Sequence, residues 1–235
     1  MRRFFLILAT VICATSISFA QITKTLNVGD FNGVDVSGDI SVTLTTEGED
    51  VGNFMYELPD NVDESQFEWE NKNGILVVKL RDQIVIGKGK KVKPTAKVTI
   101  VYKELGSIQV SSKASVLADQ VIEAELLTIK TGSVANVAVE VDVRNLDIVS
   151  STSSKITLTG SVEFLTVKAS SMAYVNTITM ECENALINAN TNAECYATSK
   201  VKFEAKATTN SNIFYKGEPE IVVVSSSSLG NVEHF

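Results

Sequence analysis

The C-terminal two thirds of the sequence is built from copies of about 19 residues each, and this repeat limits the possible folds more than any other feature. An apolar or small anchor residue marks each copy: Ile108, Ile129, Ile148, Val167, Ile187, Ala205 and Val224. The sequence numbers of successive anchors differ by 21, 19, 19, 20, 18 and 19. Seven copies in one register predict a stacked, repetitive architecture, because a unit this short cannot bury a face without its neighbours.

Each copy also has an internal pattern. Small side chains stand two, four and six residues after the anchor, and an apolar residue returns eight residues after it, as in Ile148 with Ser150, Thr152, Ser154 and Ile156. This alternation is typical of strands with one face inward. We therefore expect an all-β fold, a right-handed parallel β-helix or solenoid of about seven coils over residues 107–235. The small residues are expected to line one narrow inner wall, with their buried hydroxyls bonded in a ladder.

Residues 21–106 do not keep this register, although the stretch 34–42 alternates like a coil. We expect these residues to form an N-terminal antiparallel β cap continuous with the solenoid, since an open strand edge invites aggregation. No such segment follows the last copy. The exposed edge of that coil is expected to be able to pair with a second copy, giving a homodimer through the C-terminal coil.

The first 20 residues have the form of a cleaved signal peptide. Arg2 and Arg3 precede an apolar run from Phe4 to Ile12, and small residues occupy the positions read by a signal peptidase before a cut after Ala20. An uncleaved anchor is the alternative, although the run is short for a membrane span. The protein is therefore expected to be exported to the periplasm, the outer membrane surface or the extracellular space.

The charge of the chain excludes one class of partner. Loss of Arg2 and Arg3 with the signal peptide takes the formal net charge from −7 to −9. A surface of this sign repels phosphate backbones, so nucleic-acid binding has no electrostatic support.

Three segments carry a resemblance to a known family. They are Phe214–Pro219 (FYKGEP), Ser225–Val232 (SSSSLGNV) and the opening Phe31–Gly38 (FNGVDVSG), and the repeat pattern of the copies accompanies them. Together they resemble the family described as "putative auto-transporter adhesin, head GIN domain", over roughly residues 27 to 233. The resemblance implies an exported β-helical domain of bacterial envelopes, with a role in adhesion and no activity assigned to defined residues. This chain keeps few of the family's glycine corners, so corners that need a positive φ must be built from other residues.

Two aromatic residues are the strongest candidates for a binding site. Tyr196 and Phe214 each lie nine residues after an anchor, an outward position in adjacent coils, and Tyr174 lies nearby in the coil before. Exposed stacked aromatics suit contact with a carbohydrate or a protein. The alternative is a surface stack that only holds the coils together.

One basic cluster and two cysteines are the other candidates. Lys88, Lys90, Lys91 and Lys93 form either the tip of a hairpin or a contact for an anionic glycan or a lipid headgroup. Cys182 and Cys195 fall at inward positions of neighbouring coils, where they are either small buried residues or a disulfide.

No residue set is typical of an enzyme. The acidic residues of the repeat scatter along turns in this interpretation (Glu123, Glu125, Glu140, Asp142 and Glu163), and the sole histidine is His234. We expect no catalytic residues, no metal and no cofactor. The sequence favours an exported, adhesin-like, non-catalytic binding protein whose partner is a glycan, a protein or a lipid headgroup. The alternatives are a self-associating structural or lipid-associated envelope protein and a carbohydrate-active β-helix enzyme.

Overall fold

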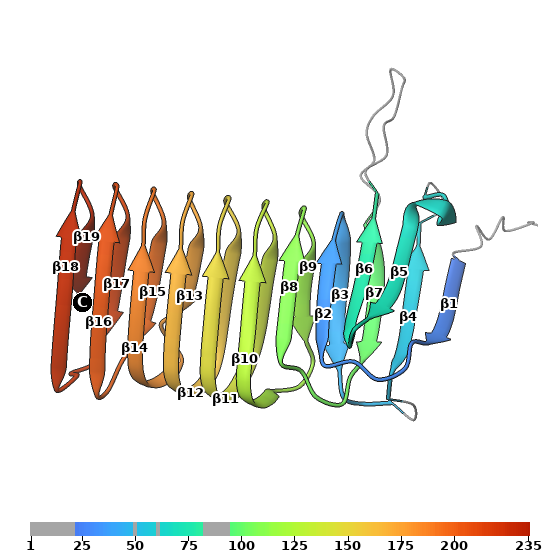
Figure 1. Cartoon of the computed structure of the whole chain (residues 1–235), viewed down its shortest axis with the longest axis horizontal. Helices are drawn as coiled ribbons and strands as arrows, with labels where there is room; N and C mark the ends of the chain where they lie inside the picture. The colour runs from blue at the N-terminus through green and yellow to red at the C-terminus, as the bar shows by residue number, and fades with distance from the viewer. Residues whose placement is uncertain (1–21, 49–50, 60–61, 82–94) are drawn as a thin grey trace, which may run out of the picture.

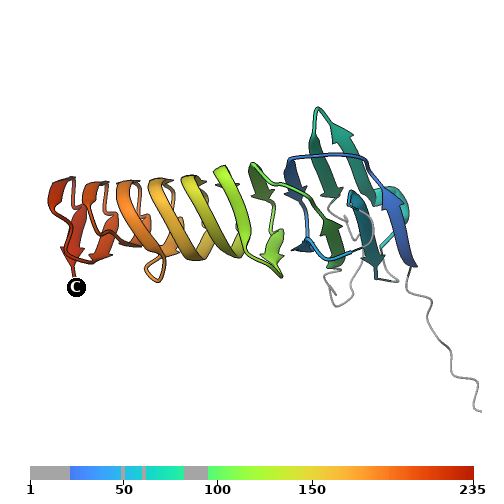
Figure 2. The ribbon, with the colours of Figure 1, turned by 90° about the horizontal axis from the view of Figure 1, so that it is seen from below.

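The computed structural model describes residues 22–48, 51–59, 62–81 and 95–235, and these form an elongated all-β rod (Figures 1 and 2). The described residues contain nineteen strands and one short 3-10 helix, η1 (Glu64–Gln66). The signal-peptide prediction for residues 1–20 and the lysine cluster of residues 88–93 lie outside them.

The C-terminal two thirds is a parallel β-solenoid, as predicted. Its strands are β8 (Ser107–Ser111), β9 (Ser115–Ala118), β10 (Ile122–Thr131), β11 (Asn136–Ser150), β12 (Lys155–Ala169), β13 (Tyr174–Thr177), β14 (Glu181–Ala189), β15 (Glu194–Thr198), β16 (Lys202–Thr208), β17 (Asn212–Lys216), β18 (Ile221–Ser227) and β19 (Asn231–His234). Figure 1 shows the coils side by side along the rod, with the C-terminus in the last coil.

Each complete coil has three faces, which we number for reference. Face 1 consists of β8, the second halves of β10, β11 and β12, and then β14, β16 and β18. Face 2 consists of β9, the first halves of β11 and β12, and then β13, β15, β17 and β19. Face 3 is short and is formed by residues 122–125, 141–144, 160–163 and 181–183, which lie between face 2 and face 1.

The register predicted from the repeat is confirmed. All seven anchors lie on face 1 opposite one another, from Ile108 to Val224. The apolar residues eight positions later, from Val116 to Val232, form a second column on face 2. The anchors up to Ala205 are buried, so the two columns form the core between the faces.

The small residues four positions after each anchor do not face inward, and that part of the prediction is wrong. They begin the tight turn between faces 1 and 2, where this residue and the next both have positive φ, as in Thr152 (φ 55°) and Ser153 (φ 58°). Each turn also bonds to the next one, for example through the Val134 N–H, which donates to the Thr152 carbonyl at 3.0 Å. This hydrogen bonding between stacked turns compensates for the strain of left-handed non-glycine residues.

Three of the buried hydroxyls form a closed cluster instead of a continuous ladder, and a fourth on the same wall, that of Ser211, bonds to the Ala189 and Thr208 carbonyls. The Oγ atoms of Thr131, Ser150 and Ser154 lie 2.9 Å from one another in all three pairs, and all three residues are buried. Neighbouring coils place alanine at the equivalent positions, for example Ala135 and Ala169. The ladder ends there because alanine has no hydroxyl to continue it.

The N-terminal third mixes parallel and antiparallel pairing. Strands β2 (Gly33–Ser37) and β3 (Ile40–Thr45) form a coil that pairs in parallel with β8 and β9. On its other side, the same coil pairs in parallel with β6 (Ile75–Leu80) and β7 (Ala96–Val101). The chain therefore builds the β2–β3 coil first and adds the β6–β7 coil outside it, before it crosses back to β8.

Three antiparallel strands complete that end of the rod. Strand β5 (Phe67–Lys72) pairs with β6, β4 (Asn53–Leu58) pairs with β7, and β1 (Ile22–Asn27) pairs with β4. Their core is aromatic: the Phe54 ring lies 5.7–6.0 Å from the rings of Tyr56, Phe67 and Trp69. That these strands protect the end of the solenoid as a cap stays a prediction.

Candidate functional site

The outer surface of face 2 carries a row of aromatic rings near the C-terminal end of the rod. The ring centroids of Tyr174 and Tyr196 are 5.7 Å apart, and those of Tyr196 and Phe214 are 5.0 Å apart with the rings nearly parallel. Phe235 meets both Tyr196 and Phe214 edge-on, at 6.3 Å and 6.1 Å. These four residues are called the aromatic patch below.

The fold brings the aromatic patch together through the strand register. Tyr196 of β15 lies directly opposite Phe214 of β17, whereas Tyr174 of β13 lies opposite Glu194, two residues away along the strand. The Phe235 N–H donates to the Tyr215 carbonyl at 3.1 Å and holds the last ring against face 2. The row therefore runs diagonally across four coils.

Three of these rings, Tyr174, Tyr196 and Phe214, are the predicted ones, and Phe235 is an addition to them. Phe235 lies eleven residues after its anchor Val224, as Lys216 does after Ala205. Phe214 points outward nine residues after its anchor, and a position two residues farther along a strand points to the same side. The same outward alternation extended by two residues could have identified it.

Charged and polar side chains surround the rings. Lys155 Nζ lies 5.5 Å from the centroid of Tyr174, and Lys216 Nζ lies 5.0 Å from that of Phe235, both within cation–π range. The Tyr196 hydroxyl donates to Glu194 Oε1 at 2.7 Å, and this hydrogen bond is the main reason that the pKa of Tyr196 is raised to about 12. The patch thus combines half-buried ring surface with amine and carboxylate groups at its margin.

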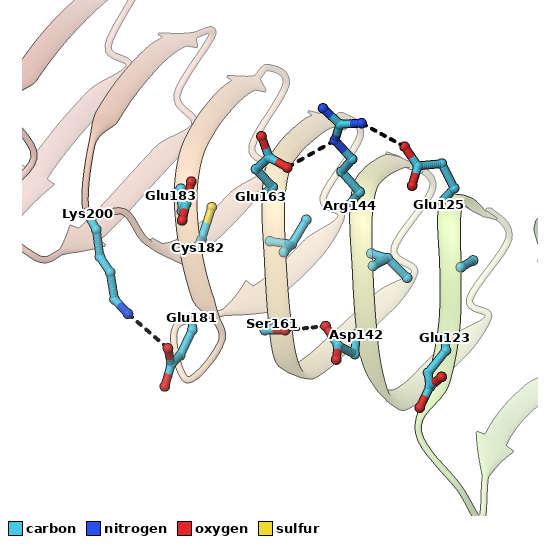
Figure 3. A pocket seen from close by; sticks show the side chains of 13 residues that line it. Glu123, Glu125, Asp142, Arg144, Ser161, Glu163, Glu181, Cys182, Glu183 and Lys200 are labelled. Carbon is cyan, nitrogen blue, oxygen red and sulfur yellow. Dashed lines mark hydrogen bonds and ion pairs between the residues drawn. The ribbon is translucent and has the colours of Figure 1, made fainter.

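Face 3 carries a second group of side chains, which corrects the sequence interpretation. Four of the acids expected to scatter along turns, all except Glu140, lie together on short strand segments around an open hollow of about 610 Å³ (Figure 3). Two columns of polar residues, one residue per coil, line this hollow. They are Glu123, Asp142, Ser161 and Glu181 in one column, and Glu125, Arg144, Glu163 and Glu183 in the other. The recurrence of polar residues at the repeat period was the missed signal.

Three of the six acids that line face 3 form ion pairs with cations of the same face, namely Glu125, Glu163 and Glu181. The Arg144 guanidinium donates to Glu125 and to Glu163, at 3.0 Å each, and bridges three coils (Figure 3). Lys200 Nζ lies 2.9 Å from Glu181 Oε2, and this hydrogen bond lowers the pKa of Glu181. These side chains are more than a third exposed, so their ion pairs add little to stability.

This pairing does not prepare a carboxyl for acid catalysis. A general acid of a glycosidase type needs a raised pKa, which burial away from cations provides. On face 3 the acids lie in the open, and the pKa of Glu181 moves downward. In the part of the chain that the structure describes, no group of three or more His, Cys, Asp or Glu residues has the arrangement to hold a metal ion.

Cys182 and Cys195 are both buried free thiols in the structure, so the disulfide alternative is not formed there. Cys182 lies on face 3 opposite Val162, whereas Cys195 lies on face 2 between Val175 and Ile213. Burial raises the pKa of each thiol to about 12. Both therefore act as small core residues.

The fold and these surfaces define a class, that of an elongated parallel β-solenoid with flat exposed faces. The family model described as "putative auto-transporter adhesin, head GIN domain" matches residues 30–219, and the chain belongs to that family. Among curated proteins, none matches the chain. No helix in the described ranges is long and apolar enough to cross a membrane.

Solved structures share the fold over nearly the whole chain. A putative adhesin from Bacteroides fragilis NCTC 9343 is 17% identical, with a TM-score of 0.79 over 93% of this chain and 98% of that one. A putative adhesin from Parabacteroides merdae ATCC 43184 is 16% identical, with a TM-score of 0.69 over 92% and 96%. A structure named a putative lipid binding protein, from Parabacteroides distasonis ATCC 8503, is 15% identical, with a TM-score of 0.66 over 92% and 96%.

Proposed function

We propose that the protein is an exported, non-catalytic binding protein that attaches to glycans on a surface through the aromatic patch of face 2. The observation that carries the proposal is the diagonal row of four rings, since aromatic side chains supply apolar contact area at a low cost in conformational entropy. The family name and the names of two similar structures support a role in adhesion.

The chemistry of the margin favours a glycan as the partner. Lys155, Lys216 and Glu194 offer donors and acceptors around the rings, and Asn176 and Thr198 add an amide and a hydroxyl on the same strands. Because Tyr196 and Phe214 stack on each other, a sugar would meet their outer edges and the half-exposed ring of Phe235. Apolar contact with a few convergent polar groups is typical of small-molecule and sugar sites.

The lysine cluster and the signal peptide enter the proposal as well. Lys88, Lys90, Lys91 and Lys93 are proposed as a secondary contact for anionic groups, such as a uronate or a lipid headgroup. Cleavage after Ala20 is proposed to place the protein in the cell envelope or outside the cell.

A glycan array on the purified protein tests the proposal, followed by binding of the Tyr196→Ala/Phe214→Ala variant to the best ligands. We expect that variant to lose at least tenfold in affinity. Phe164→Ala/Leu186→Ala is the control, because both are exposed apolar side chains on face 1, away from the aromatic patch. Unchanged glycan binding by the face 2 variant would refute the proposal.

A further inference from the structure

The last coil of the solenoid exposes a strand whose sequence is typical of a covered one. In β18, Ile221, Val222, Val223 and Val224 are 45–53% exposed. Two of them, Val222 and Val224, continue the inward column of the buried Phe203 and Ala205, so their exposure comes from the uncovered end of the coil. On β16, the outward positions that pair with Ile221 and Val223 are Lys202 and Glu204, so the apolar outer surface begins at β18.

The free edge of β18 also lacks the usual protection against pairing. Edge strands normally carry charged residues that prevent association, and β18 has none between Ile221 and Ser227. The free edges at the other end of the rod differ, because β1 carries Lys24 and β5 carries Glu68, Glu70 and Lys72. At the C-terminal end, β18 has no charged residue and β19 has Glu233 alone, so association is opposed less there than at the other end.

We infer that the C-terminal coil is a docking surface for a second copy of this chain, joined end to end by a two-fold axis through Val224 and Val232. An end-to-end arrangement of this kind closes after two copies, because the charged N-terminal end offers no matching edge. Strand β18 would pair with its own counterpart in antiparallel fashion, and β19 with its counterpart.

The hydrogen-bonding directions of β18 fit this axis. The Ile221 N–H donates to the Val201 carbonyl at 3.1 Å, toward the preceding coil. Because backbone groups alternate along a strand, those of Val222, Val224 and Ser226 point to the free edge. Val224 would then face itself across the axis as a hydrogen-bonded pair.

The side chains are self-complementary in the same register. On β18, Val222 would lie opposite Ser226 of the second copy, without a charged group between them. With Val232 on the axis, Asn231 would lie opposite Glu233 of the second copy, so no carboxylate meets another. Leu229, which is 85% exposed, would lie opposite Phe235, which is 52% exposed.

The area of the end surface agrees with a dimer of modest affinity. Seven residues of strand span about 23 Å, and two sheets with their outer side chains occupy about 20 Å, which gives roughly 500 Å² per partner. The total of roughly 1,000 Å² is at the lower limit for a specific interface. We therefore expect a dimer that dissociates on dilution.

The dimer would extend the binding surface. Because the axis is perpendicular to the sheets, face 2 of both copies would lie on the same side, with the two aromatic patches next to each other. If the proposed glycan binding holds, a surface that displays many copies of the ligand would be held at two sites at once. This consequence rests on the proposed function, whereas the dimer itself does not.

Analytical ultracentrifugation of the purified protein without ligand tests the dimer. The average mass should rise toward twice the monomer mass with concentration, and Val224→Lys should keep it at the monomer mass by opposing two ammonium groups. Val134→Lys is the control, since Val134 is an exposed valine in a turn far from the end; it should associate like the parent. A parent that stays monomeric, or a Val224→Lys variant that associates normally, would overturn the inference.

Cysteine cross-linking tests the register even if Val224→Lys unfolds. Hydrogen-bonded antiparallel partners have Cα atoms about 5.5 Å apart, within reach of a disulfide. Val224→Cys should thus form a covalent dimer under oxidation. Val222→Cys should not, because four residues separate it from its counterpart by about 13 Å. Equal cross-linking of both variants would contradict the two-fold axis. If the protein forms the dimer but binds no glycan, only the proposed function is refuted.

Discussion

The buried hydroxyl cluster allows a prediction in which a single substitution costs more stability than a triple one. Thr131, Ser150 and Ser154 form a closed triangle of three 2.9 Å contacts inside the solenoid. In such a ring each hydroxyl donates once and accepts once, so every group is satisfied. Ser154→Ala opens the ring and leaves one of the other two hydroxyls with an unpaired O–H in a site that water does not reach.

The size of the loss follows from that unpaired group. A buried donor without a partner costs about 1–3 kcal/mol, and Ser154→Ala should lower the free energy of unfolding by this amount. The triple variant Thr131→Val/Ser150→Ala/Ser154→Ala removes every polar group at once. Neighbouring coils already have alanine at the positions of Ser150 and Ser154, namely Ala169 and Ala135. We expect the triple variant to stay within about 1 kcal/mol of the parent, since removal of all partners is close to neutral.

Urea unfolding followed by far-UV circular dichroism measures both values. Ser115→Ala is the control: its half-exposed side chain should change the stability by less than about 0.5 kcal/mol. A triple variant that loses as much stability as the sum of its three single variants would contradict the prediction, because each hydroxyl would then contribute independently.

Three further predictions concern single residues. Cys182 and Cys195, with thiol pKa values of about 12, should resist alkylation at pH 8 in the native protein and react within minutes in guanidinium chloride, which peptide mass mapping can follow. Tyr196 has a pKa raised from 10.0 to about 12, so its hydrogen bond stabilises the protein below pH 10 and is lost as the pH rises through 12. When tyrosinate absorbance is titrated in the parent and in Tyr196→Phe, the parent should show one more late-titrating tyrosine. Gly160→Ala should destabilise the protein by more than about 2 kcal/mol, because φ is 106° and the new Cβ would lie 1.9 Å from the Val141 carbonyl oxygen. In Gly132→Ala the new Cβ would lie 3.6 Å from its nearest neighbour, so that variant should cost less than about 1 kcal/mol. Thermal unfolding measures both values.

The repeat made the solenoid predictable because a stacked coil copies its register from one turn to the next. Once Ile108 and Ile129 are aligned, every later anchor and every residue eight positions after it has a fixed place. The turns were harder to predict. A serine or threonine four residues after an anchor suits an inward small position and a left-handed turn equally well, and only the bonds between stacked turns decide for the turn.

The N-terminal third could not be predicted in this way, because its strands pair with segments far along the chain and a local sequence pattern does not contain such pairing. The stretch that contains Val34 alternates like a coil, yet its partner Ile108 comes much later in the chain, after the segments that form β4 to β7. The columns of face 3 were accessible in principle, since Glu125, Arg144 and Glu163 follow one another at the period of the anchors. The anchors that define the coils are apolar, so the equal spacing of these charged residues is not part of the pattern that predicts the coils.

A last prediction tests the role of the N-terminal strands as a cap. Phe54 has no exposed surface and contacts the three other rings of that region, so Phe54→Ala should remove about 3–5 kcal/mol from its stability. Trp69, the sole tryptophan, lies in β5 and reports on these strands alone by fluorescence, whereas circular dichroism is dominated by the coils.

If the antiparallel strands are a cap, the two signals should separate in Phe54→Ala. The Trp69 transition should move to lower temperature, and the coils should remain folded with the edges of β6 and β7 uncovered. An uncovered strand edge can pair with other molecules, and β6 and β7 carry only one lysine each, Lys79 and Lys97. Light scattering should therefore rise between the two transitions and should not rise in the parent. Coincident transitions without scattering would mean that the N-terminal strands and the coils unfold as one unit. Protection of the end would then not be a separate role of β1, β4 and β5.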